Sequence, residues 1–131
     1  MADESLIYSL RDLAPAGSYW YLASPYSAHP RGIFRAAREA CEAAAYLIAR
    51  GVRLYCPIAH THSIAICGGL DPGDHDLWLP ADRPFIDGAC GLIVLMLDGW
   101  DKSKGIEFER SCFAQAGKPL IRMAWPRWRH R

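Results

Sequence analysis

Four short stretches of the chain are almost continuously apolar and rich in β-branched or aromatic residues, a pattern typical of buried strands. The third stretch contains no polar residue, as expected of a strand that is buried on both faces of a parallel sheet. The four predicted strands are residues 19–24 (YWYLAS), 52–58 (VRLYCPI), 91–97 (GLIVLML) and 119–125 (PLIRMAW).

Apolar residues recur at spacings of three and four between these stretches, which predicts helices that bury one face. The clearest case is residues 31–50, where the charged side chains lie largely off the apolar stripe and Gly51 follows as a natural end. We expect further helices over 81–90 and 104–116, and a short helix within residues 1–18.

Residues 59–80 (AHTHSIAICGGLDPGDHDLWLP) form a long polar stretch in which glycine and proline cluster around position 70. The pattern predicts a long irregular loop. Loops of this length inside a compact domain are often functional.

The predicted order of elements alternates strand and helix, which indicates an α/β fold with a parallel sheet and helices on both faces. Ligands of such sheets bind beyond the carboxyl ends of the strands. Those ends lead into residues 24–32, 57–80 and 98–110. We found no internal repeat, so the prediction is a single domain over residues 1–131, with 1–18 as a lead-in and 126–131 as a basic tail.

Composition narrows the function classes. The 131 residues carry a net charge of only +1, which gives no general attraction to nucleic acid. No apolar run approaches the ~20 residues that a membrane-spanning helix needs, and the N-terminus is acidic where a signal peptide is basic. We therefore expect a cytoplasmic protein that binds neither nucleic acid nor membrane. The final WPRWRHR is interpreted as a solvated tail, with a phosphate or RNA contact as the alternative.

The cysteines do not indicate a disulfide framework or a zinc ribbon, because their number is odd, at five, and no C-x-x-C occurs. They are interpreted as small buried hydrophobic residues. In an extended segment His60 and His62 would share one side, so a metal site that also uses His75 is conceivable. Because further ligands at tight spacing are lacking, contact of one or both histidines with a ligand is the favoured interpretation. We expect no metal and no cofactor.

The segment DGWDKSKGIEFER, residues 98–110, carries the most specific candidate chemistry. Ser103 is a natural N-cap for the helix that follows, and a helix N-terminus offers free N–H groups to an anion. Lys102 and Lys104 add positive charge, and Gly99 and Trp100 lie in the preceding turn.

Gly105 and Glu109 are four residues apart and therefore share one face of that helix. Helical side chains lean toward the N-terminus, so Glu109 would reach back over Gly105, where no Cβ obstructs a ligand. The pattern predicts a carboxylate above a sugar-sized gap, one turn from an anion site. The alternative is an ordinary serine-capped helix that happens to contain glutamate.

Further candidates flank the same edge of the sheet. The stretch YLASPYS supplies Tyr21, Ser24, Pro25 and Tyr26, which either contact a ligand or belong to the core. A second carboxylate for glycosyl transfer could come from any of four aspartates, namely Asp82, Asp87, Asp98 and Asp101.

The order of these motifs resembles a family of small bacterial proteins that is similar to the nucleoside 2-deoxyribosyltransferase-like superfamily. The motifs are YLASPYS, then WLPADRPFID, then LIVLMLDGWDKSKGIEFERSCFAQAGKPL, and together they span residues 19–120. The resemblance implies a flavodoxin-like, three-layer α/β sandwich of about five parallel strands, and a homo-oligomer, either a dimer or a tetramer.

The resemblance also implies roles for individual residues. Glu109 corresponds to the nucleophile, Tyr21 to the tyrosine that steadies it, and Asp82 to the acid that handles the proton of the base. Ser103 corresponds to the serine with which nucleotide hydrolases contact a 5′-phosphate, where transferases tend to carry aspartate. Ser24, Pro25, Tyr26, His60, His62, Gly99, Trp100 and Gly105 complete the expected substrate-binding set.

The reaction implied is hydrolysis of the base–sugar bond of (deoxy)nucleoside 5′-monophosphates, with a small nucleotide as the partner. Base exchange between nucleosides is the first alternative, although transferases borrow an asparagine from a neighbouring subunit and this chain contains none. The sequence also leaves open a non-catalytic binder of nucleotides or ADP-ribose-like ligands, and a structural or phage-accessory protein whose site has decayed.

Overall fold

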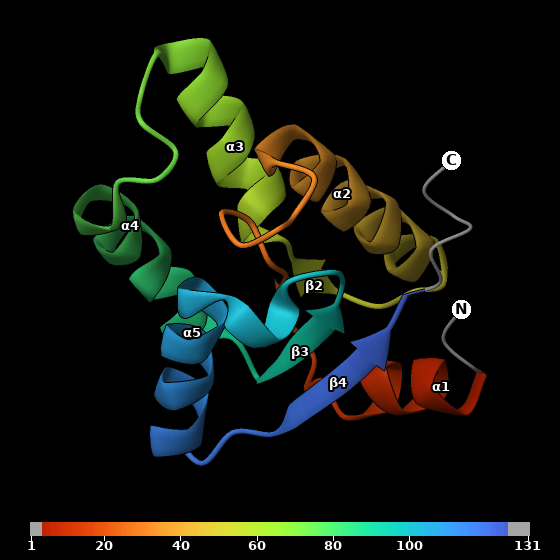
Figure 1. Cartoon of the computed structure of the whole chain (residues 1–131). Helices are drawn as coiled ribbons and strands as arrows, with labels where there is room; N and C mark the ends of the chain where they lie inside the picture. The colour runs from red at the N-terminus through yellow and green to blue at the C-terminus, as the bar shows by residue number, and fades with distance from the viewer. Residues whose placement is uncertain (1–3, 126–131) are drawn as a thin grey trace.

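The chain builds one parallel sheet flanked by helices, and the computed structural model describes residues 4–125 of it. Four strands lie in the order β2-β1-β3-β4, and all three neighbouring pairs are parallel. Figure 1 shows the elements in place. In chain order they are α1 (Glu4–Asp12), β1 (Trp20–Ala23), α2 (Ile33–Ala49), β2 (Leu54–Tyr55), α3 (Pro57–Gly68), α4 (His75–Gly88), β3 (Gly91–Met96), the 3-10 turn η1 (Trp100–Lys102), α5 (Lys104–Gln115) and β4 (Leu120–Ala124).

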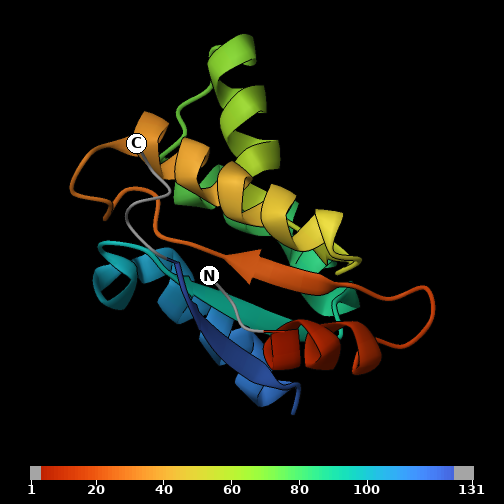
Figure 2. The same ribbon diagram turned by 90° about the vertical axis from the view of Figure 1, so that its right-hand side faces the viewer.

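The sheet is the middle of three layers because successive side chains of a strand point to opposite faces. Trp20, Leu22, Ile93 and Leu95 pack on one face with α1 and α2, whereas their neighbours in β1 and β3 pack on the other face with α4 and α5. Figure 2 shows α2 and α5 on opposite sides of the strands. This is the predicted three-layer, flavodoxin-like arrangement.

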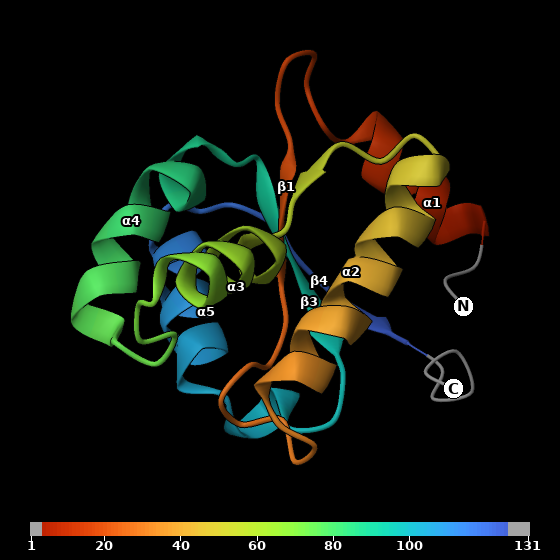
Figure 3. The ribbon, with the colours of Figure 1, turned by 90° about the horizontal axis from the view of Figure 1, so that it is seen from above.

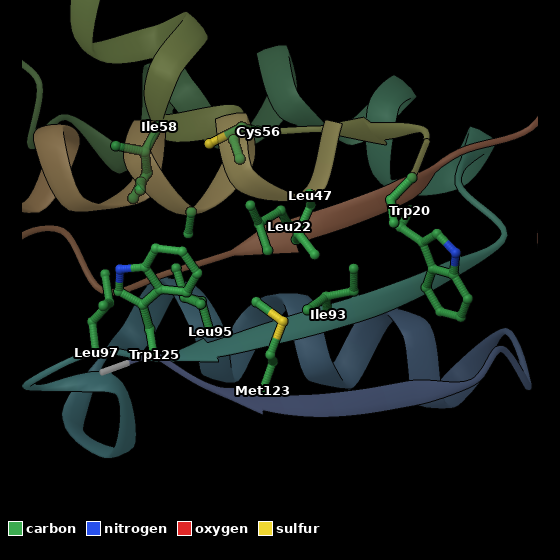
Figure 4. Packing of buried hydrophobic residues seen from close by; sticks show 14 of the residues in the cluster. Trp20, Leu22, Leu47, Cys56, Ile58, Ile93, Leu95, Leu97, Met123 and Trp125 are labelled. Carbon is green, nitrogen blue, oxygen red and sulfur yellow. The ribbon is translucent and has the colours of Figure 1, made fainter. Parts of the chain in front are cut away.

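The larger core lies between α2 and the sheet. Figure 4 shows Leu47 of α2 directed at Leu22 and Ile93, with Met123 of β4 and Trp125 closing the far side. Trp20 is fully buried and its indole N–H donates to the Leu10 carbonyl oxygen at 2.6 Å, which ties α1 to the sheet. This core fixes the strands whose ends carry the candidate site.

Most predicted elements are confirmed. The helix expected within residues 1–18 is α1, and those expected over 31–50 and 104–116 are α2 and α5. Two details differ. The predicted strand 52–58 contracts to the two residues of β2, because Pro57 already begins a helix, and residues 4–125 contain four strands rather than about five.

The long loop predicted over residues 59–80 is wrong. Most of the segment is helical: α3 begins with Pro57 in its first turn, and Gly69 ends it in the left-handed conformation that glycine tolerates. The helix α4 then starts at His75 rather than near 81 and contains Pro80 and Pro84. Viewed from above in Figure 3, α3 lies between α2 and α4.

Glycine is required where β3 begins. A Cβ on Gly91 would overlap the Trp20 ring and lie 2.9 Å from the Pro119 carbonyl oxygen. Backbone and indole therefore approach each other more closely here than any larger residue permits.

We predict that Gly91→Ala lowers the free energy of unfolding by roughly 1–3 kcal/mol, the usual cost of overpacking a filled core. Urea denaturation measures the difference. Gly68→Ala is the matched control, because a Cβ at this position in α3 meets no atom within 4 Å and alanine favours helix. Equal stability of the Gly91 variant and the wild-type protein would contradict the close packing.

Candidate active site

A cavity of about 300 Å³ lies at the carboxyl end of the sheet, where the segments that follow β1, β2 and β3 meet α4. Its volume suits one small molecule. The lining residues are Ser24, Tyr26, Ser27 and Ala28 after β1; Pro57, Ile58 and Thr61 of α3; Pro72, His75, Trp78, Leu79, Asp82 and Ile86 in or before α4; and Lys102, Ser103, Lys104, Gly105 and Glu109 in or before α5.

One end of the cavity is the N-terminus of α5. Ser103 is its N-cap, as predicted, and the Ser103 Oγ accepts the Ile106 N–H at 3.2 Å. The hydroxyl can still donate its own proton. Free N–H groups, the serine hydroxyl and two adjacent lysines, Lys102 and Lys104, all line this end. Such a combination favours an anion.

Glu109 stands one turn further along α5 and lines the same cavity, as the spacing to Gly105 predicts. Desolvation by the surrounding protein raises the pKa of Glu109 from its ordinary 4.5 to about 8. A hydrogen-bonding interaction with the Tyr21 hydroxyl lowers that pKa in part, and the neighbouring Asp82 raises it. Glu109 is therefore largely protonated at neutral pH in the ligand-free protein.

Asp82 reaches the cavity from α4 and is the second carboxylate of the site. Burial raises the pKa of Asp82 from 3.8 to about 6. Asp87, Asp98 and Asp101, the other acids considered from the sequence, do not line the cavity. The Asp87 carboxylate instead accepts from Arg83 Nε at 2.9 Å.

Tyr21 stands in β1 beneath the two carboxylates and is fully buried, with its ring 5.8 Å from that of Phe113 and 5.9 Å from that of Tyr55. Burial raises the pKa of Tyr21, and Glu109 and Asp82 raise it further. The Tyr21 hydroxyl therefore stays protonated, and it lies within the electrostatic influence of both carboxyl groups.

Three buried polar atoms at this site form no hydrogen bond of ordinary geometry with any residue of the described chain. They are the Tyr21 hydroxyl, the Ser24 hydroxyl and Asp82 Oδ1. The Tyr21 hydroxyl and Glu109 interact electrostatically but fall outside strict hydrogen-bond geometry. Leaving a buried polar group unsatisfied costs about 1–3 kcal/mol. Ser24 and Asp82 line the cavity, and Tyr21, which does not line it, neighbours Glu109 and Asp82, so the unsatisfied groups cluster at this site.

The wall that α4 contributes combines apolar side chains with His75 and Asp82, and apart from Asp82 it was not predicted as part of the site. The α4 residues His75, Trp78, Leu79, Asp82 and Ile86 recur at spacings of three and four and form one face of the helix. That period was present in the sequence, but the prolines within it and the preceding Gly68-Gly69 and Pro72-Gly73 pairs favoured a loop. Pro57, Ile58 and Thr61 of α3 extend the wall.

The expected placement of His60 and His62 on one side of an extended segment is wrong, because this segment is the helix α3. Residues two apart on a helix point in different directions, so the two histidines do not share one side. The His60 Nδ1 pairs with the Tyr55 hydroxyl at 2.8 Å, whereas the His62 Nδ1 pairs with the Tyr26 hydroxyl at 2.6 Å. Neither histidine lines the cavity, and His62 acts on it only by holding Tyr26.

Three other predicted contacts also lie outside the lining. Pro25 belongs to the loop that follows β1, and it is buried without lining the cavity. Gly99 packs against the Ala28 carbonyl group, where a Cβ would overlap it. The ring of Trp100 lies 6.0 Å from the Arg122 guanidinium. Gly99 and Trp100 therefore shape the turn before α5 rather than touch a ligand.

Within residues 4–125, no group of three or more His, Cys, Asp or Glu side chains is placed to hold a metal ion, and no helix has the length and apolarity to cross a membrane. The basic tail 126–131 lies outside the described residues. A second, more open hollow of about 740 Å³, near Tyr19, Arg53 and Tyr55, has no carboxylate among its lining residues.

Comparison with known protein families identifies the family to which the chain belongs. The sequence model of DUF1937, a domain of unknown function, matches residues 18–125. The chain belongs to this family. The match spans the sheet and every element that lines the cavity. No curated protein sequence matches the chain.

The raised pKa of Glu109 predicts a measurable pH dependence of stability. The unfolded chain releases this proton near pH 4.5 and the folded protein near pH 8, so the folded state loses stability as pH rises across that window. Glu109→Gln removes the effect. We expect the variant to gain roughly 1–3 kcal/mol over wild type between pH 5 and pH 8, less than the full shift because the cavity admits water.

Urea denaturation of both proteins at pH 5, 6.5 and 8 measures this difference. Asp82→Asn serves as the comparison, since its window lies lower, between about pH 4 and pH 6. A constant difference between the Glu109 variant and wild type across the three pH values would show that Glu109 is solvated.

Proposed function

We propose that the protein is an N-glycosidase that hydrolyses the base–sugar bond of (deoxy)nucleoside 5′-monophosphates. One observation carries the proposal: two carboxylates, Glu109 and Asp82, line one cavity whose end is the N-terminus of α5. The resemblance to the nucleoside 2-deoxyribosyltransferase-like superfamily supports the same reading of these residues.

The anion end of the cavity supports a phosphorylated substrate. The 5′-phosphate would accept hydrogen bonds from the first N–H groups of α5 and from the Ser103 hydroxyl, with Lys102 and Lys104 balancing its charge. The sugar would then lie over Gly105, where no side chain intervenes, and its anomeric carbon would face Glu109. The base would extend along the wall formed by α4 and α3.

The reaction follows the double-displacement chemistry of retaining glycosidases. The ionised Glu109 attacks the anomeric carbon as the bond to the base nitrogen breaks, and Asp82 gives the departing base its proton. Asp82, now a carboxylate, takes a proton from water, whose oxygen displaces Glu109 from the sugar. The products are the free base and the sugar 5-phosphate.

The protonation of Asp82 and Glu109 supports their separate roles as acid and nucleophile. With pKa values of about 6 for Asp82 and about 8 for Glu109, the two groups together hold about one proton at neutral pH. The reaction needs one carboxylate and one acid. Positive charge that develops at the anomeric carbon favours the ionised form of Glu109. The single proton that the two carboxyl groups share is then held by Asp82, which donates it to the departing base. Tyr21 would steady the ionised form of Glu109 through its hydroxyl.

A non-catalytic nucleotide-binding protein is the second candidate, and one observation favours it. A Glu109 that is protonated at neutral pH is a poor nucleophile until substrate changes its environment. Base exchange would use the same first step with a second base in place of water.

We predict that wild-type protein releases free base from a nucleoside 5′-monophosphate and that Glu109→Gln abolishes release while retaining binding. Asp82→Asn should lower the rate by about 10²–10⁴-fold, the usual contribution of a general acid. Chromatography of the free base across a panel of nucleotides, together with calorimetric binding, measures both effects.

The pH profile of kcat/KM provides the internal control. Activity should fall below about pH 6, where both carboxyl groups are protonated, and above about pH 8, where both are ionised. Binding without base release by the wild-type protein would favour the binding protein, and a new nucleoside on addition of a second base would indicate transfer. Equal turnover of nucleoside and nucleotide would contradict the role of Ser103.

Gly105 offers a separate test of where the sugar lies. A Cβ at this position meets only the Ser103 Oγ, at 3.7 Å, so packing does not require glycine. Because alanine favours helix, Gly105→Ala should stabilise the protein by about 0.5–1 kcal/mol and yet weaken nucleotide binding at least tenfold by filling the gap over which the sugar lies. Thermal denaturation and calorimetry separate the two effects. Unchanged affinity would show that the sugar lies elsewhere.

A further inference from the structure

Apart from tyrosine and cysteine, three polar or charged residues within residues 4–125 are buried as whole residues, namely Ser24, His29 and Glu39, whereas Asp82 and Glu109 are partly buried. Ser24 belongs to the cavity. His29 and Glu39 lie outside its lining and play no part in the chemistry proposed above. Burying two titratable side chains is costly unless they are paired, so their presence calls for a reason.

The contacts of His29 fix its tautomer. The Arg31 backbone N–H donates to His29 Nδ1 at 3.1 Å, so Nδ1 carries no proton. The proton is therefore on Nε2, which donates to Glu39 Oε1 at 2.6 Å. The other carboxylate oxygen, Oε2, lies 3.7 Å from the Arg35 guanidinium. A neutral histidine thus ties the loop after β1 to the first turns of α2.

That loop forms one wall of the cavity through Ser24, Tyr26, Ser27 and Ala28. Its last turn is closed at His29, whose N–H donates to the Tyr26 carbonyl oxygen at 3.2 Å and whose carbonyl oxygen accepts the Gly32 N–H at 3.1 Å. His29 therefore holds the loop through both its backbone and its side chain.

The same loop touches the turn that leads into α5. Gly99 packs so closely under the Ala28 carbonyl group and the His29 N–H that a Cβ would overlap the former. The Lys102 N–H then donates to the Gly99 carbonyl oxygen at 3.1 Å, immediately before the N-cap Ser103. Ala28 is thereby connected to the N-terminus of α5 through Gly99 and Lys102.

We propose that His29 is a positioning residue that sets the loop after β1 against the turn before α5 and so builds the anion end of the cavity. The use of that end for a 5′-phosphate rests on the proposed function. The mechanical link from His29 through Ala28 and Gly99 does not.

The test uses three substitutions that remove the two side-chain hydrogen bonds separately and together. His29→Asn keeps an acceptor at the position of Nδ1, His29→Gln keeps a donor at the position of Nε2, and His29→Phe keeps neither. Amide hydrogen exchange of the ligand-free proteins is followed by NMR. The reporters are the hydrogen-bonded amides of Arg31 and Gly32 in the first loop and of Trp100 and Lys102 in the second.

We expect exchange at these four amides to accelerate roughly fivefold in the Asn and Gln variants, the factor that corresponds to one lost hydrogen bond, and more in the Phe variant. The amides of β3 should exchange at the wild-type rate once any change in the free energy of global unfolding has been subtracted. Leu47→Ala is the matched control, because it removes a buried side chain of α2 that belongs to the core and not to the cavity wall.

Two results would overturn the proposal. One is acceleration at Arg31 and Gly32 with wild-type exchange at Trp100 and Lys102, which would confine the effect to one loop. The other is an equal change at all amides, as in Leu47→Ala, which would reduce His29 to a stability residue.

Ligand binding separates this proposal from the proposed function. The affinity ratio between a nucleoside 5′-monophosphate and its nucleoside should fall about tenfold in His29→Phe and less in the Asn and Gln variants. If wild-type protein neither binds nucleotide nor releases base while the exchange pattern holds, the proposed substrate is wrong and the positioning role stands.

Discussion

The site depends on the desolvation of two carboxyl groups that share one cavity. Burial raises the pKa of Glu109 and of Asp82, and the proximity of Asp82 raises that of Glu109 further. Neither group ionises as it would in water, so the pair retains a proton at a pH where exposed acids have none. Desolvating two carboxyl groups lowers the stability of the folded protein. Acids with perturbed pKa values in a cleft are therefore a physical indicator of function.

The parallel sheet is what brings these groups together. All its strands end on one side, so β1 contributes Tyr21 and the loop with Ser24, while β3 leads through the turn at Gly99 into α5. The close contact between Gly99 and Ala28 joins these two segments, which are far apart in sequence. The N-terminus of α5 and the loop that begins at Ser24 thus line one cavity that neither segment could form alone.

The sequence predicted the parts of the structure that local physics determines. The apolar runs marked the strands, and the Ser103 cap with the four-residue spacing of Gly105 and Glu109 placed a carboxylate above an anion end. It failed where tertiary packing overrides local signals. Glycine and proline around position 70 suggested a loop, whereas Pro57 and Gly69 begin and end a helix, and α4 contains two prolines.

The same override explains the misplaced histidines and the missed wall. An extended segment would have put His60 and His62 on one side, but the turn of α3 sends them to Tyr55 and Tyr26. Trp78, which lines the cavity, has its indole N–H held by the Asp71 carbonyl oxygen at 2.8 Å. No local sequence rule foretells a contact of that kind.

The position of Asp82 follows from how α4 is anchored. The last turns of α4 are tied down: the Tyr19 hydroxyl donates to the Phe85 carbonyl oxygen at 2.8 Å, Ile86 is buried, and Lys118 Nζ donates to the Asp87 carbonyl oxygen at 2.7 Å. The first half is mostly exposed. Proline at 80 and 84 removes two helical N–H donors, one on either side of Asp82. Asp82 thus stands where the anchored half of α4 begins, so the contacts of Tyr19, Ile86 and Lys118 fix its position relative to the sheet.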